Sequence, residues 1–92
     1  MRISGDELER ARAATEHLLE ELGVEAYLFQ VEPRDGYWEV DVECAVRQGW
    51  QRIVLRVGRE RLLASWKQGE VRDALLAEWG SELEDCRKEG GR

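Results

Sequence analysis

Three consecutive segments between residues 27 and 57 alternate apolar and polar side chains with a period of two, and this pattern constrains the fold more than any other feature of the chain. A period of two indicates β-strands that bury one face. The sequence therefore predicts a three-stranded antiparallel meander with one buried and one exposed face. The apolar members are Tyr27, Phe29 and Val31, then Trp38, Val40, Val42, Cys44 and Val46, then Ile53, Leu55 and Val57.

Two glycine-containing dipeptides separate these segments, Asp35-Gly36 and Gln48-Gly49. Both suit two-residue hairpin loops, and Asp-Gly is the stronger signal. Counting outward from the first loop pairs Val31 with Val40. Counting outward from the second loop pairs Val40 with Val57. In both hairpins apolar residues then face apolar residues, and a slip of one residue would place apolar side chains opposite polar ones.

The exposed face of this meander has an acidic second strand and a basic third strand. The predicted register places Asp41 opposite Arg56, with Glu43 diagonal to Arg52 and Arg56. Opposite charges across neighbouring strands stabilise a sheet modestly. Cross-strand pairing therefore accounts for this charge pattern without a ligand.

The segment from residue 5 to residue 22 has the pattern of an amphipathic helix. Ser4 and Glu7 have the spacing of a capping box, and Gly23 suits a C-terminal cap. The apolar positions recur at intervals of three and four. They are Leu8, Ala11, Thr15, Leu18, Leu19 and Leu22.

Two readings fit the segment from Gly58 to Gln68, a fourth strand or a short helix, and the shared helical face of Leu62, Leu63 and Trp66 favours the helix. A last helix is predicted from about Glu70 to Cys86. Its apolar stripe is Val71, Leu75, Leu76, Trp79 and Leu83. The predicted fold class is α+β in the order α-β-β-β-α, a single domain over residues 1–92 with the helices on one face of the sheet.

The charge of the chain disfavours nucleic acid as a partner. Acidic residues outnumber basic ones by 20 to 14, which gives a formal net charge of −6. Proteins that bind nucleic acid usually concentrate positive charge, and here only residues 47–61 have a local excess. No run reaches the ~18 apolar residues that span a bilayer, and the N-terminus lacks the apolar core of a signal peptide. We therefore expect a cytoplasmic protein without a membrane partner.

The two cysteines, Cys44 and Cys86, form neither a disulfide framework nor a metal motif. Cys44 falls on the apolar face of a strand and is interpreted as a small buried hydrophobe. Cys86 lies near the C-terminus, where we expect partial exposure. In a reducing compartment a disulfide between them is not expected.

No group of residues in the sequence predicts catalysis, a cofactor or a metal site. His17 is the only histidine, and a metal site needs several ligands. Glu39, Asp41 and Glu43 are interpreted as a solvated, salt-bridged sheet face. The stretch Gly58–Glu60 lacks the glycines and lysine of a phosphate loop. The chain is therefore predicted not to be an enzyme, although an enzyme using the carboxylates of Glu39 or Asp41 remains the third hypothesis.

An interface is predicted on the outer face of the sheet. Its candidate residues are Tyr37, Trp50, Val54 and Leu28, because aromatic side chains are enriched in interfaces. Open sheet edges also invite pairing with a partner strand or a second copy. The leading hypothesis is a protein-interaction module whose partner is another protein or a homo-oligomer.

The order helix, three antiparallel strands, helix resembles the double-stranded RNA-binding domain in topology. That family reads RNA with a lysine-rich start to its second helix. The corresponding residues here, Gln68–Asp73, are not basic. RNA binding is therefore the alternative hypothesis, disfavoured by charge, and the chain is assigned to no family.

Overall fold

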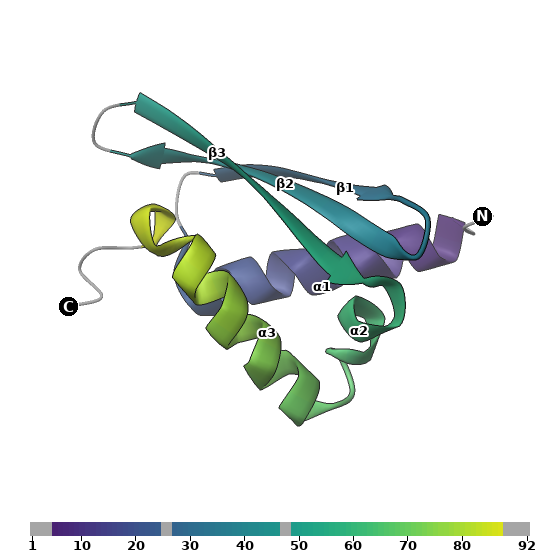
Figure 1. The fold of residues 1–92 in the computed structure, drawn as a ribbon. Helices are drawn as coiled ribbons and strands as arrows, with labels where there is room; N and C mark the ends of the chain where they lie inside the picture. The colour runs from purple at the N-terminus through teal and green to yellow at the C-terminus, as the bar shows by residue number, and fades with distance from the viewer. Residues whose placement is uncertain (1–4, 25–26, 47–48, 88–92) are drawn as a thin grey trace.

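The computed structural model describes residues 5–24, 27–46 and 49–87. The strands form one antiparallel sheet in the order β1-β2-β3, and the helices lie against one of its faces (Figure 1). This arrangement confirms the predicted α+β fold. The elements are α1 (Gly5–Leu22), β1 (Tyr27–Pro33), β2 (Tyr37–Val46), β3 (Gly49–Gly58), α2 (Arg59–Ala64), α3 (Gly69–Glu82) and the 3-10 turn η1 (Glu84–Cys86).

Helix α1 has the predicted bounds and buries the predicted stripe apart from Leu8, which is half-buried. Its Ala11, Thr15, Leu18 and Leu19 are buried against the sheet and the other helices. Gly23 follows at a φ of 78°, and the amide of Val24 donates to the carbonyl of Leu19 at 3.1 Å. This bond closes the helix in the way that a C-terminal glycine allows. Ser4 of the predicted capping box lies outside the described residues.

The hairpin between β1 and β2 has the predicted register. Val31 pairs with Val40, Phe29 with Val42 and Tyr27 with Cys44. The amide of Arg34 donates to the carbonyl of Tyr37 at 2.8 Å across the turn. Gly36 has a φ of 88°, a conformation that glycine adopts at no steric cost.

The predicted register between β2 and β3 is wrong by two residues. Gly49 is not in the loop but pairs with Val46 inside the ladder, so Val40 faces Leu55 and Val42 faces Ile53. Residue 48 of the predicted loop lies outside the described residues. A shift of two leaves every side chain on the same face, so the apolar alternation is satisfied in both registers and could not distinguish them.

The segment after β3 is the short helix that the sequence favoured. Leu62 of α2 is fully buried, and the indole Nε1 of Trp38 donates to the carbonyl of Arg59 at 3.0 Å. This bond ties the start of α2 to the centre of the sheet. Trp38 itself is fully buried, which confirms its predicted place in the core.

The C-terminal helix ends earlier than predicted. α3 stops at Glu82, and Leu83 leaves the helical conformation with φ −104° and ψ 21°. The amide of Cys86 then donates to the carbonyl of Leu83 at 2.9 Å in the 3-10 turn η1. This tighter turn carries Cys86 under the end of β2.

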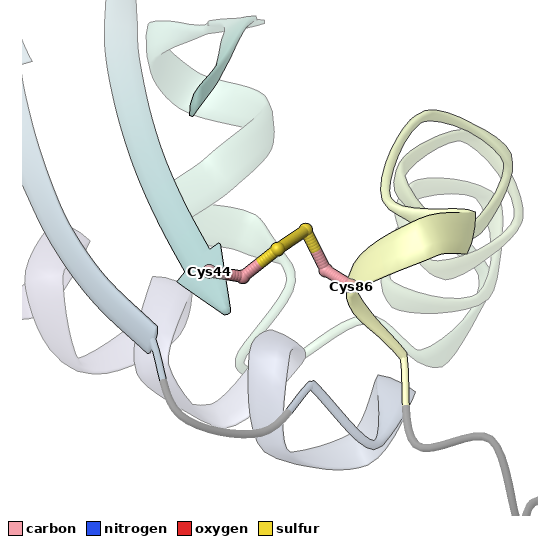
Figure 2. Close-up of a disulfide and its surroundings, with 2 residues drawn as sticks. All are labelled: Cys44 and Cys86. Carbon is pink, nitrogen blue, oxygen red and sulfur yellow. A yellow bond between two sulfur atoms is a disulfide. The ribbon is translucent and has the colours of Figure 1, made fainter. Parts of the chain in front are cut away.

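The two cysteines are joined in a disulfide, contrary to the prediction. Figure 2 shows the bond between Cys44 at the end of β2 and Cys86 in η1. Cys86 is 3% exposed and Cys44 is fully buried, so the expectation of partial exposure for Cys86 is also wrong. The error has a physical origin: the prediction assumed a reducing compartment, whereas the fold brings the two Cα atoms to 5.6 Å, within bonding range.

Candidate functional site

The face of the sheet opposite the helices is open, and its side chains follow from the strand alternation. Figure 1 shows no helix on this side of the sheet. β2 contributes a central acidic row, and β3 contributes arginines alternating with apolar residues. The side chains on this face are Leu28, Gln30 and Glu32 of β1, Tyr37, Glu39, Asp41, Glu43 and Ala45 of β2, and Trp50, Arg52, Val54 and Arg56 of β3.

Ion pairs cross this outer face, but not between the predicted partners. Arg52 Nε lies 2.9 and 3.0 Å from the two carboxylate oxygens of Asp41. The predicted Asp41–Arg56 pairing is wrong, because the corrected register places Glu39 opposite Arg56 and Val54 opposite Asp41. Hydrogen bonds from Arg52 hold the pKa of Asp41 below its ordinary value, and the same bonds raise the pKa of Arg52.

The four predicted interface residues do not form one cluster. Trp50 and Val54 lie on β3 and are 65% and 42% exposed, whereas Leu28 lies on β1 and is 63% exposed. The acidic row of β2 separates Leu28 from the other two. Tyr37 is half-buried at the other end of the sheet, since it pairs with Gly58 while Trp50 pairs with Ala45. The exposed apolar surface of the sheet is therefore split between its two edge strands.

Within the described residues, the backbone of β3 directs outward a row of N–H and C=O groups that have no partner strand. The hydrogen bond between Arg34 and Tyr37 shows that the odd-numbered residues of β2 turn their backbone groups toward β1. Because successive residues alternate sides, the even-numbered residues of β2 bond to odd-numbered residues of β3. The residues whose N–H and C=O groups face away from the sheet are therefore Trp50, Arg52, Val54 and Arg56.

The free edge of β1, unlike that of β3, contains a proline. The same alternation turns the backbone of Pro33 toward the free edge, and proline has no N–H group to offer there. Proline on an edge strand discourages pairing with other chains. Between Gly49 and Gly58, β3 contains no proline. The two edges are thus unequal, and β3 is the one that can accept a strand over its length.

A groove runs beside the β3 edge. It has a volume of about 510 Å³ and lies between β3 and α3. Val54, Leu55 and Arg56 form one side, and Glu78, Trp79 and Glu82 of α3 form the other. Trp79 is 3% exposed and Leu55 is 5% exposed. The groove therefore has an apolar floor and an acidic rim on the helix.

The arginines of residues 47–61 are largely engaged with carboxylates in the described chain. Besides the Arg52–Asp41 pair, Arg59 lies 2.9 Å from Glu7 and Arg61 lies 2.6 Å from Glu78. Hydrogen bonding from Arg61 also lowers the pKa of Glu78. Arg47 lies outside the described residues. Pairing on this scale neutralises much of the local positive charge.

A second pocket, of about 200 Å³, lies where the three helices meet. The imidazole of His17 stacks on the indole of Trp66 with ring centroids 5.4 Å apart, and its Nε2 lies 3.4 Å from a carboxylate oxygen of Glu21. His17 is thus held by neighbours on the flank of α1. Arg72 also lines this pocket, and its buried Nε has no hydrogen-bond partner in the described structure.

Within the described residues, no three His, Cys, Asp or Glu side chains are grouped to hold a metal ion. No helix formed by those residues has the length and apolar character needed to cross a membrane. Comparison with known proteins finds no matching family model, no matching curated protein and no matching solved structure.

Sequence reasoning placed Trp50 and Val54 on the outer face but missed what surrounds them. It did not identify Arg52 and Arg56 as residues with outward backbone groups on the free edge, nor Glu78 and Trp79 as the far wall of a groove. The places of Arg52 and Arg56 could have been predicted, because alternate residues of an edge strand direct their backbone groups toward its free edge. The place of Glu78 and Trp79 beside β3 depends on the direction in which α3 runs, and no pattern in the sequence predicts that direction.

Proposed function

We propose that the protein is an interaction module that binds an extended polypeptide segment by strand addition along β3. One observation carries the proposal: the ten-residue edge strand β3 presents outward backbone groups at alternate residues from Trp50 to Arg56, beside a groove of about 510 Å³. In strand addition, main-chain hydrogen bonds supply affinity and the alternate side chains supply specificity.

The neighbours of the added strand define the chemistry of a suitable segment. On the outer face it would lie beside Trp50, Arg52, Val54 and Arg56, which favours aromatic, aliphatic or acidic side chains. On the inner face it would enter the groove over Leu55 and Trp79. Aliphatic side chains suit this floor. The preferred segment therefore has apolar residues on both faces and no arginine or lysine opposite Arg52 or Arg56.

The edge can be blocked without disturbing the sheet. Val54→Pro removes an outward N–H group and leaves the bonds between β2 and β3 intact. Val54→Thr is the matched control, because it keeps the N–H group, the shape and the β-propensity. The measurement is native mass spectrometry of each protein purified from its host, with circular dichroism as the check of folding.

The wild type and Val54→Thr are expected to retain a bound polypeptide, either another protein or a second copy, and folded Val54→Pro is expected to lose it. Crosslinks from the bound chain should map to β3. A folded Val54→Pro variant that retains the same polypeptide with unchanged affinity would contradict the proposal.

Nucleic-acid binding through residues 47–61 is the alternative. The ion pairs of Arg52, Arg59 and Arg61 with carboxylates support ranking it second, since those arginines already have partners. A gel-retardation assay with RNA and DNA at low salt decides the matter, because phosphate contacts give an affinity that falls steeply with salt. We assign no catalytic, cofactor or metal role.

Cytoplasmic residence stays a prediction, and the disulfide supplies its test. Disulfides are rare in the cytosol of mesophiles and persist in oxidising compartments. Because both cysteines are buried, host cells would be quenched in acid and the protein alkylated after denaturation, which labels Cys44 and Cys86 as thiols if they reside in a reducing cytosol. Unmodified cysteines would place the protein in an oxidising compartment.

A further inference from the structure

We propose that the strand added to β3 is the β3 strand of a second copy of this chain. The two strands would run antiparallel about a two-fold axis, so that two three-stranded sheets become one of six strands. The inference rests on the proposed function, since it uses the same edge, and adds the identity of the occupant. Two-fold pairing requires that the edge be complementary to itself.

The side chains of β3 are self-complementary in one register. When Ile53 faces Ile53 of the second copy, Arg52 faces Val54 of that copy and Trp50 faces Arg56. All four residues with outward backbone groups then find partners. In this register no arginine stands directly opposite another arginine.

The neighbouring registers lack this property. Sliding the strands by two residues in one direction places Arg52 opposite Arg52 of the second copy, and sliding them the other way places Arg52 opposite Arg56. Like charges directly opposite one another destabilise a strand pair. Either slide also leaves one of the four outward residues without a partner among the four, Arg56 in the first case and Trp50 in the second.

The preferred register uses side chains whose exposure is otherwise unexplained. Trp50, 65% exposed, would be covered by the guanidinium of Arg56 from the second copy, a cation–π contact that occurs twice in the dimer. Arg52 is already paired with Asp41, so its charge is neutralised as it approaches Val54 of the other copy. On the inner face, half-buried Ile53 would meet its own counterpart.

The first part of the test is sedimentation equilibrium over a range of protein concentrations. The wild type and Val54→Thr are expected to be dimers, and folded Val54→Pro is expected to be a monomer. Trp50→Ala is expected to weaken dimerisation by about tenfold, because it removes both cation–π contacts. Tyr37→Ala, which changes the aromatic residue at the other end of the sheet, is the control and should leave the dimer unchanged.

The second part tests the register with single cysteines at positions 52, 53 and 54. In the proposed register Ile53→Cys faces itself across the two-fold axis, so it should form an intermolecular disulfide faster than the other two variants. Arg52→Cys would crosslink fastest in one alternative register and Val54→Cys in the other. Fastest crosslinking at position 52 or 54 would overturn the proposed register.

A wild-type protein that is monomeric at all concentrations would overturn the second-copy inference. The proposed function has a separate outcome in the same experiment. If monomeric wild type still binds a segment of another protein and Val54→Pro does not, the edge is a strand-binding site with a different occupant. If neither a second copy nor another polypeptide covers β3, both proposals fail.

Discussion

Reducing the Cys44–Cys86 disulfide is expected to lower the free energy of unfolding by about 4 kcal/mol. The bond closes a loop with a sequence separation of 42 residues. In the chain-entropy description, a crosslink over such a loop removes enough freedom from the unfolded chain to contribute about 4 kcal/mol at 25 °C. A domain of this length has about 5 to 14 kcal/mol in total, so the disulfide accounts for a large part of its stability.

The assay is equilibrium unfolding in urea of the same wild-type protein with and without a phosphine reductant. With a slope of about 1.5 kcal/mol/M, the midpoint should fall by about 2 to 3 M urea on reduction. Cys44→Ala/Cys86→Ala is the control for effects of the reductant itself, and its midpoint should not respond. Using one sequence for both arms avoids the cavity that alanine would leave at these buried sites.

Two results would refute this reasoning. Coincident midpoints for oxidised and reduced protein would mean that the bond does not constrain the unfolded chain as described. Two reactive thiols per chain in protein unfolded without prior reduction would mean that the bond is not formed at all. The second outcome would also restore the sequence-based interpretation of Cys44 as an ordinary buried hydrophobe.

Three further substitutions test other parts of the structure. Arg72→Met should raise the stability by about 1 kcal/mol in thermal unfolding, because it removes a buried Nε that has no partner in the described structure. Arg52 lowers the pKa of Asp41, so this pair stabilises the fold above the ordinary pKa of Asp41, and that contribution is lost as the pH falls through the lowered pKa. Asp41→Asn lacks this contribution, so it should lose less stability than the wild type when urea unfolding at neutral pH is compared with urea unfolding at acidic pH. An equal loss of stability in the two proteins would contradict the prediction. Gly36→Ala should destabilise the protein by about 1 kcal/mol in urea, because φ is 88° there, and an unchanged midpoint would show that the turn can relax.

The sequence predicted most reliably where a residue type admits few conformations. α1 was placed correctly because its apolar stripe and Gly23 agree on the same bounds. The β1–β2 register followed from Asp35-Gly36, since glycine readily supplies the positive φ found at Gly36. Local chemistry and burial pattern gave the same answer in both places.

The β2–β3 register shows where that reasoning fails. The sequence predicts Gly49 in a turn, whereas its φ of 133° occurs within the strand, opposite Val46. The two-residue shift replaces the predicted pair of Asp41 and Arg56 with Glu39 and Arg56. Both registers place an acidic residue opposite a basic one, so neither the charges nor the apolar pattern could distinguish the predicted register from the observed one.

The disulfide could have been inferred from one overlooked signal. Cys86 lies three residues after Leu83, which itself follows Trp79 by four, so Cys86 extends the buried stripe of the C-terminal segment. Its distance from Cys44, however, depends on the early end of α3 and on the turn η1, and no pattern in the sequence indicates either feature. The groove beside β3 was missed for the same reason.

Amide hydrogen exchange along β3 tests the central claim, that this strand is an open edge that takes on another strand. In dilute protein without a partner, the outward amides of Arg52, Val54 and Arg56 should exchange rapidly, while those of Ile53 and Leu55 should exchange slowly. At high protein concentration, or with a bound partner segment, the outward amides should become protected as well. Outward amides that are already slow in the dilute monomer, or that stay fast under every condition, would contradict the account.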